Sequence, residues 1–333
     1  MSAVLVTGGT GFLGQHVVAK LSRGGVVPRV LVRGTYEPML DEEVELVRGD
    51  VVEDPPGATS LQEAMRGVSE VYHLAGLVSR DEESASAMMR VHVDGTKRVL
   101  RAAKEAGVRR VVVASSSGTV AVSRAAAPVP TEESGYAEEI VAGWPYYLSK
   151  IYQERVAFEL AGKLGIEVVV VNPSLLLGPG DRRGSSTGDV LKFLRREIPV
   201  VPPGGINFVD ARDAAEATVT AMAVGRPGHR YLLGGPNLTM AEYFGRLARV
   251  AKVRAPVLRV PERVATAGAS LIGHFFRGVL DREPPIDRVS VEMAQVFWYC
   301  DSSKARRELS FDPRDPGETL DETVRYLRRS FRI

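Results

Sequence analysis

Tyr146 and Lys150 form a pair of side chains whose types and spacing could move a proton. A spacing of four residues places both on one face of a helix, one turn apart. A tyrosine phenol alone has a pKa of about 10, which makes it a poor acid or base near neutral pH. A neighbouring ammonium stabilises the phenolate and lowers that pKa. The pair could therefore exchange a proton with a carbonyl or alcohol oxygen.

Three consecutive serines, Ser115, Ser116 and Ser117, directly follow a short apolar run that ends at Ala114. In an open α/β sheet, ligands bind at the carboxyl ends of the strands. A serine hydroxyl there can donate to a substrate oxygen as negative charge builds on it. Serines also form turns and caps. Their place between the Tyr146/Lys150 pair and a nucleotide turn favours the catalytic interpretation.

That nucleotide turn lies at the N-terminus, where the apolar run 3–6 is followed by a glycine-rich stretch and an amphipathic run from residue 12 to 21. The glycines fit G-x-G-x-x-G through Gly9, Gly11 and Gly14, and also G-x-x-G-x-x-G through Gly8, Gly11 and Gly14. A strand, a glycine turn and a helix start collect backbone N–H groups around one point, which attracts a pyrophosphate. The alternative is a tight turn without a ligand, but the strand–turn–helix context favours a nucleotide site.

The elements that must position these groups alternate along the chain. Short β-branched runs occupy residues 30–32, 44–47, 71–74, 111–114 and 168–171, and helical patterns occupy 93–106 and 147–164. Apolar strands separated by helices predict an α/β fold of the Rossmann type, a doubly wound parallel sheet covered on both faces. We expect residues 1–172 to form the NAD(P)-binding domain, with residues 206–233 returning to it. Residues 173–205 and 234–333 would form a smaller, more helical substrate-binding lobe.

Composition excludes several classes of function. The 43 basic and 41 acidic side chains nearly cancel, and no basic stripe interleaved with aromatics is present, so a nucleic-acid partner is not expected. The single cysteine, Cys300, rules out an intrachain disulfide and fits a reducing compartment. No signal peptide and no apolar run of about 20 residues is seen, which predicts a cytoplasmic protein without a transmembrane helix. The five histidines are scattered without metal-ligand spacing, so no metal is expected.

The apolar segment 264–276 could touch a membrane surface, but a buried or lid-like helix that covers a pocket is the preferred interpretation.

The motifs together resemble the extended short-chain dehydrogenase/reductase family, and most closely its dihydroflavonol-reductase-like branch. The stretches that carry the resemblance are Thr7–Gly14, Tyr72–Gly76, Ser115–Val120, Pro145–Lys150 and Asn172–Pro173, in the family's order. The resemblance implies hydride transfer at a nicotinamide, with Tyr146 as the acid/base. Lys150 would hold the nicotinamide ribose and lower the pKa of Tyr146, and a serine would polarise the substrate oxygen.

Which serine acts stays open at this point, because aligning on Gly-Thr-Val favours Ser116 and the epimerase-like spacing favours Ser117. The chain departs from the family at His92, where Asn is common. We assign His92 no role and interpret it as a helix-surface histidine.

The expected cofactor is NADP(H), with NAD(H) as the alternative. NAD-selective sites usually place an acidic residue after the second strand, whereas this chain has Arg33, which suits a 2′-phosphate. Thr35 could add a hydroxyl donor. The residues expected to contact the cofactor are Gly8, Thr10, Gly11, Phe12, Leu13, Arg33, Asp50, Val51, Leu74, Ala75, Gly76, Tyr146, Lys150 and Pro173.

The substrate is expected to be a small, hydrophobic carbonyl or alcohol. The predicted pocket walls are Ser79, Val120, Trp144, Tyr147, Leu176 and Phe208. Most of these are apolar or aromatic, which suits a ring-bearing ketone or aldehyde. Asp181, Arg182 and Arg183 could grip an anionic group, but a charged surface loop is the preferred interpretation.

Three alternatives accompany the predicted reductase. One is a 3β-hydroxysteroid-type dehydrogenase, and another is a nucleotide-sugar epimerase or dehydratase with tightly bound cofactor. The third is a cofactor-sensing regulator, which the intact serine, Tyr146 and Lys150 set disfavours. A homodimer is possible through the helix that carries Tyr146 and the helix before it.

Overall fold

The computed structural model describes residues 3–34, 43–54, 57–198, 200–256, 258–259 and 288–333. Two expectations, a hydroxyl donor at Thr35 and a covering helix at 264–276, lie outside the described residues.

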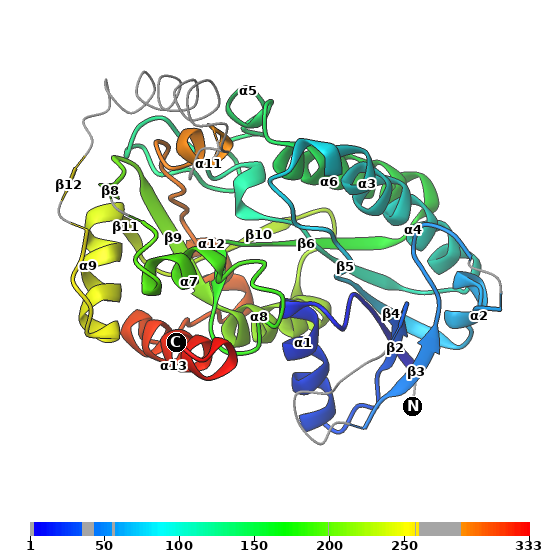
Figure 1. Ribbon diagram of the computed structural model, residues 1–333. Coiled ribbons are helices and arrows are strands. Elements are labelled where there is room, and N and C mark those ends of the chain that lie inside the picture. The colour runs from blue at the N-terminus through cyan, green and yellow to red at the C-terminus, as the bar shows by residue number, and fades with distance from the viewer. Residues whose placement is uncertain (1–2, 35–42, 55–56, 199, 257, 260–287) are drawn as a thin grey trace.

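A seven-stranded parallel sheet forms the centre of the molecule (Figure 1). In spatial order its strands are β3 (Glu45–Arg48), β2 (Arg29–Val32), β1 (Ala3–Thr7), β4 (Val68–His73), β5 (Arg110–Ala114), β6 (Glu167–Pro173) and β10 (Arg230–Leu233). The strand order runs outward in both directions from β1 and β4, which makes the carboxyl ends of these two strands the switch point where α/β sheets bind ligands. The predicted Rossmann-type fold is confirmed.

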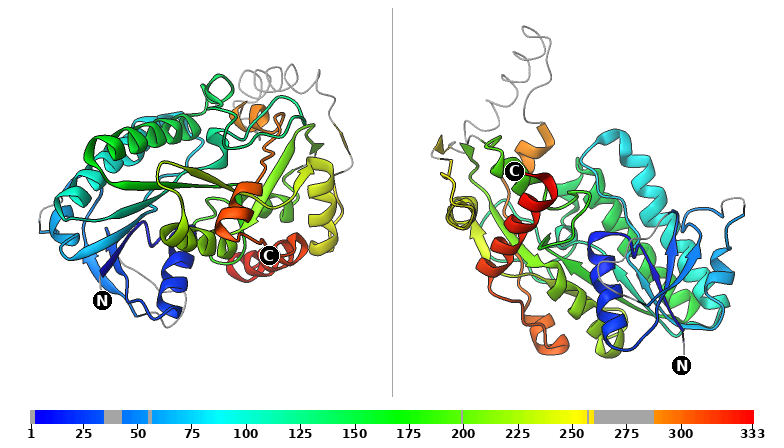
Figure 2. Two further views of the ribbon diagram at one scale, coloured as in Figure 1. Left: turned by 180° about the vertical axis from the view of Figure 1, so that it is seen from behind. Right: turned by 60° about the horizontal axis from the view of Figure 1, so that its bottom comes forward.

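Helices cover both faces of this sheet, as Figure 2 shows from two further sides. One face carries α2 (Leu61–Ala64), α4 (Gly95–Glu105) and α6 (Pro145–Leu164), and the other carries α1 (Phe12–Arg23), α8 (Ala211–Val224) and α12 (Ser303–Leu309). Successive side chains of β5 point to opposite faces of the sheet, so Val111 and Val113 pack in the core on the first face and Val112 in the core on the second. This two-sided burial explains why the strands are almost continuously apolar.

A second, three-stranded sheet holds β7 (Leu175–Leu177), β9 (Gly205–Asp210) and β11 (Asn237–Thr239). Around it lie α7 (Gly188–Leu194), α9 (Met240–Ala251), α11 (Arg288–Met293) and α13 (Pro316–Phe331), and β8 (Val200–Val201) pairs with β12 (Leu258–Arg259). Within residues 206–233, β9 belongs to this small sheet, α8 packs against α1, and β10 joins the main sheet. The division into two lobes stays a prediction.

Between β4 and β5 the chain forms the short helices η1 (Glu82–Ser84) and α3 (Ala85–Met89) and the π-helical turn η2 (Arg90–Asp94). The 3-10 turn η3 (Ser117–Thr119) follows β5, and α5 (Glu138–Val141) precedes α6. Within the described part of the chain, no helix combines the length and the apolar character needed to cross a membrane.

Candidate active site

The glycine turn after β1 provides an anion cradle. Gly8 has a φ of +73°, and a Cβ there would lie 2.5 Å from the backbone nitrogen of Ala75. The turn leads into α1, whose N-cap is Gly11, and no side chain caps the helix or places a carboxylate in its first turn. Phe12 and Leu13 are buried and fix this turn against the core. Uncapped N–H groups at a helix start bind phosphate groups, so these residues fit a dinucleotide pyrophosphate.

Other residues predicted to contact the cofactor lie at the same edge of the sheet, where the parallel strands have their carboxyl ends. Arg33 follows β2, Asp50 follows β3, residues 74–76 follow β4, and Pro173 ends β6. Arg33 lies with its Nη1 3.8 Å from Asp50 Oδ2, and its side chain is 71% exposed. Such an exposed, long ion pair is weak, so the guanidinium is available to a 2′-phosphate.

Lys150 is buried on α6 beside the end of β5. Its Nζ donates to the Ala114 carbonyl at 2.9 Å and to Gln153 Oε1 at 2.8 Å. Burial lowers the pKa of Lys150 to about 7, although the charge of Glu154 opposes this effect. The ammonium therefore gains or loses its proton close to neutral pH.

Tyr146 lies one turn before Lys150, in the first turn of α6. Burial and the neighbouring Tyr147 raise the pKa of Tyr146, and a hydrogen bond with the Ser116 side chain lowers it. Lys150 is not among the groups that shift this pKa, and its Nζ donates to Ala114 and Gln153. The phenol is thus held in its protonated form, with Ser116 as its hydrogen-bonding partner.

The loop that carries the serines is held by a buried carboxylate, Glu154. Its Oε1 accepts from Ser115 Oγ at 2.5 Å, from Thr119 Oγ1 at 2.8 Å and from Asn172 Nδ2 at 2.6 Å. Ser115 therefore supports the loop, while Ser116 faces Tyr146. Glu154 was not predicted, although its position four residues after Lys150 places it on the same helical face.

The second Glu154 oxygen faces a single cation. Arg230 Nε lies 3.3 Å from Glu154 Oε2, and the guanidinium also stacks over the Tyr136 ring at 4.4 Å. Glu154 is fully buried. The pair thus joins α6 to the edge strand β10.

We expect Glu154→Leu to destabilise the protein by about 3–5 kcal/mol, because it leaves a buried guanidinium and three donors without their acceptor. Glu154→Gln keeps an acceptor for the serine loop and should cost less, about 1–3 kcal/mol. Chemical denaturation of both variants measures the difference. Equal stability of Glu154→Leu and the parent would contradict this role.

Aromatic side chains form a wall beside Tyr146. The Tyr147 ring lies 5.0 Å from Tyr146 and 4.8 Å from Trp298, and Trp144 backs the Trp298 ring at 5.5 Å, centroid to centroid. Gly118 of the serine loop allows this approach, because a Cβ there would lie 2.9 Å from Trp298. Trp298 was not predicted, since it is about 150 residues away in sequence and no local motif marks it.

Three predicted pocket residues lie elsewhere. Phe208 is 1% exposed and packs against Tyr243 at 5.8 Å, ring centroid to ring centroid, in the core of the small sheet. Val120 is likewise buried, in a cluster with Leu232 and Cys300. Leu176 packs against the core on the α1 side of the main sheet. Their apolar side chains pack in these clusters, and a contact with substrate stays a prediction for all three.

The loop after β4 reaches the second sheet's helices. Ser79 Oγ accepts from the Asp81 N–H at 3.0 Å, and Arg80 Nη2 pairs with Asp189 on α7 at 2.6 Å. The charges of Arg80 and Asp189 act on the Tyr147 phenol in opposite directions, so this ion pair lies toward the aromatic wall.

Asp181 also departs from the expected surface loop. It is buried, and its carboxylate accepts from the backbone N–H groups of residues 185–187 and from two hydroxyls. Asp181 therefore organises its own loop, while Arg182 and Arg183 are exposed.

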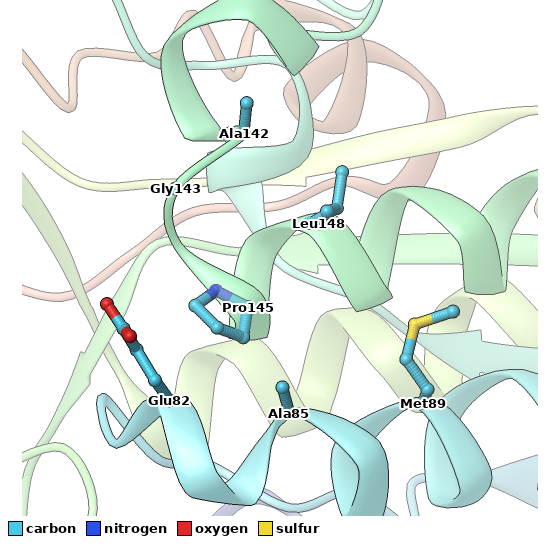
Figure 3. A pocket seen from close by; sticks show the side chains of 7 residues that line it. All are labelled: Glu82, Ala85, Met89, Ala142, Gly143, Pro145 and Leu148. Atoms are coloured by element: carbon cyan, nitrogen blue, oxygen red, sulfur yellow. The ribbon is translucent and has the colours of Figure 1, made fainter.

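A shallow pocket of about 350 Å³ lies between α3 and the start of α6 (Figure 3). Its lining comes from η1, α3 and the α5–α6 connection, with Ala85 and Met89 opposite Pro145 and Leu148. None of the predicted site residues lines it. Among the described residues, no group of three or more His, Cys, Asp or Glu side chains is placed to hold a metal ion.

A glycine turn that fits a pyrophosphate at the switch point, with a tyrosine and a lysine on one helical face nearby, is typical of a dinucleotide-dependent oxidoreductase. Comparisons with known proteins agree. Residues 4–234 match the NAD dependent epimerase/dehydratase family. The chain therefore belongs to this family and is an NAD(P)-dependent oxidoreductase, and the resemblance to extended short-chain dehydrogenases/reductases is confirmed.

Three similar proteins span nearly the whole chain. A putative dihydroflavonol 4-reductase of Synechocystis sp. is 29% identical, covering 97% of this chain and 94% of that protein. Sterol demethylase protein B of Methylococcus capsulatus is 31% identical, covering 97% and 98%. The crystal structure of gox2253 superimposes with a TM-score of 0.85 at 28% identity and covers 100% of both chains.

Proposed function

We propose that the protein is an NADPH-dependent reductase of a hydrophobic, ring-bearing ketone or aldehyde. One observation carries the proposal: the hydrogen-bonded Ser116–Tyr146 pair lies beside the aromatic wall of Tyr147 and Trp298. The similarity to a putative dihydroflavonol 4-reductase supports it.

Each residue of the site has a separate role in the proposed carbonyl reduction. Bound NADPH supplies the hydride that reduces the carbonyl carbon. Tyr146, whose raised pKa keeps the phenol protonated, donates its proton to the carbonyl oxygen. Ser116 donates a hydrogen bond to the same oxygen as negative charge builds there. Lys150, buried on the same helical face as Tyr146, would hold the nicotinamide ribose of the bound cofactor.

The wall next to Tyr146 selects the substrate. Tyr147 and Trp298 offer ring faces at which a planar apolar group can stack, and such contacts contribute about 0.5–1.5 kcal/mol beyond area burial. Arg80 and Asp189 neutralise each other at this end of the site. The arrangement suits an uncharged aromatic or polycyclic carbonyl better than a diphosphate sugar.

The test is NADPH consumption, followed by absorbance, with a panel of aromatic and alicyclic ketones and aldehydes. We expect turnover with ring-bearing carbonyls and little with short aliphatic ones. Tight NADPH binding without turnover of any carbonyl would contradict the proposal.

A second candidate is oxidation of a 3β-hydroxysteroid-type alcohol, which the similarity to sterol demethylase protein B favours. The same tyrosine, serine and lysine would run the chemistry in reverse. Faster NAD⁺ reduction with a sterol alcohol than NADPH oxidation with any carbonyl would select it.

Arg33 is the residue we expect to set the cofactor preference for NADPH. Loss of a charged hydrogen bond costs about 1.5–3 kcal/mol, so Arg33→Ser should lower kcat/KM for NADPH by about 10- to 100-fold and leave NADH nearly unchanged. The control is Arg109→Ser, an exposed arginine that precedes β5 and so lies at the opposite edge of the sheet. Comparable use of NADH and NADPH by the parent enzyme would contradict this assignment.

A further inference from the structure

His92 is an interior residue, which corrects the expectation of a surface histidine. It is 0% exposed and lies in the π-helical turn η2 between α3 and α4. Single π-helical turns are rare within α-helices and often occur at functional sites. Here the turn places an imidazole in the interior, with its ring centroid 5.8 Å from that of Tyr146 in an edge-to-face contact.

The hydrogen bonds of His92 fix its tautomer. The Leu77 backbone N–H can only donate, and it lies 3.0 Å from His92 Nε2, so Nε2 must be the acceptor. The proton therefore sits on Nδ1, which donates to Ser149 Oγ at 2.8 Å. Ser149 in turn donates to the Tyr146 carbonyl at 2.7 Å.

This chain of bonds joins two parts of the site. One end is the backbone of Leu77, which directly follows residues 74–76, three residues predicted to contact the cofactor. The other end is the first turn of α6, which carries the tyrosine. The His92 and Ser149 side chains are both buried, so water does not compete for these bonds.

We propose that His92 is a positioning residue, which acts through Ser149 to hold Tyr146 and through Leu77 to hold the loop beside the cofactor. The proposal rests on the proposed reductase function for its effect on turnover, but its effect on the cofactor loop does not. Burial and the charge of Lys150 lower the pKa of His92 to about 2, so the ring stays neutral and the bond directions hold at working pH.

Three variants separate the two ends of the chain. His92→Leu removes both hydrogen bonds. His92→Gln offers an amide oxygen for the Leu77 N–H and an amide N–H for Ser149, so it can replace the imidazole at both ends. Ser149→Ala cuts the link to Tyr146 and leaves the bond to Leu77. Thermal melting of all three shows which variants fold.

For the reductase reaction, we expect His92→Leu and Ser149→Ala each to lower kcat by about 10- to 100-fold, because small misplacements of an acid are costly. Titration calorimetry with NADPH should show about 2- to 10-fold weaker binding to His92→Leu and unchanged binding to Ser149→Ala. His92→Gln should recover kcat and affinity to within a few-fold of the parent.

A folded His92→Leu variant with parental NADPH affinity and kcat would overturn the proposal. So would a folded His92→Gln variant that is as impaired as His92→Leu. If His92→Leu fails to fold, the other two variants test the proposal. It then requires a lowered kcat with unchanged NADPH affinity in Ser149→Ala, and near-parental kcat and NADPH affinity in His92→Gln. If the parent reduces no carbonyl, the proposed function fails, and NADPH affinity alone tests His92.

Discussion

Tyr146→Phe is expected to lower kcat for carbonyl reduction by about 10²- to 10⁴-fold, the usual contribution of a positioned general acid. The substitution removes the hydroxyl that we assign as proton donor and keeps the ring that packs against Tyr147 and His92. The fold and NADPH binding should therefore persist. Steady-state kinetics with a ring-bearing carbonyl and calorimetric titration of NADPH measure the two quantities separately.

The serines provide the matched control for this prediction. Ser116 is the serine that hydrogen-bonds Tyr146, whereas the described structure gives Ser117 no such contact with the phenol. Ser116→Ala should therefore lower kcat, and Ser117→Ala, one residue along the same turn, should keep most of it. A Tyr146→Phe variant with parental kcat would exclude the tyrosine as the acid, and a larger loss in Ser117→Ala would reverse the serine assignment.

The fold was predictable because its signals are local. The inner strands β1, β2, β5 and β6 are short runs rich in valine and leucine, and burial on both faces favours that pattern. The glycine turn and the Tyr146/Lys150 spacing are also local, so the sequence places them on the correct elements. A parallel sheet with one switch point then brings them to one edge.

The rest of the site depends on contacts between distant segments, which a single sequence does not show. Trp298, from the C-terminal part of the chain, packs against Tyr147. His92 faces the interior because it lies in a π-helical turn, which no residue pattern in the sequence predicts. Phe208 shows why an apolar residue is hard to assign from sequence. An apolar side chain next to a predicted site is as suitable for a core as for a pocket, and here it packs in a core.

Lys150→Met is expected to abolish most turnover and also to change how stability depends on pH. The lysine has a folded pKa of about 7, against 10.5 for the free side chain. Between these values the unfolded chain binds more protons than the folded one, so stability rises with pH by up to about 1.4 kcal/mol per unit. A methionine removes that titration, so this contribution to the rise should vanish in the variant.

The readout is the free energy of unfolding without cofactor at several values between about pH 7 and 9.5, below the range where tyrosines ionise. Lys163→Met is the control, because Lys163 lies on the same helix with an exposed side chain and should leave the pH dependence unchanged. If the free energy of unfolding changes with pH in the same way in the parent and in Lys150→Met, burial does not lower the pKa of Lys150. The divergence we expect would mean that this protein keeps, for catalysis, a lysine that costs it stability near neutral pH.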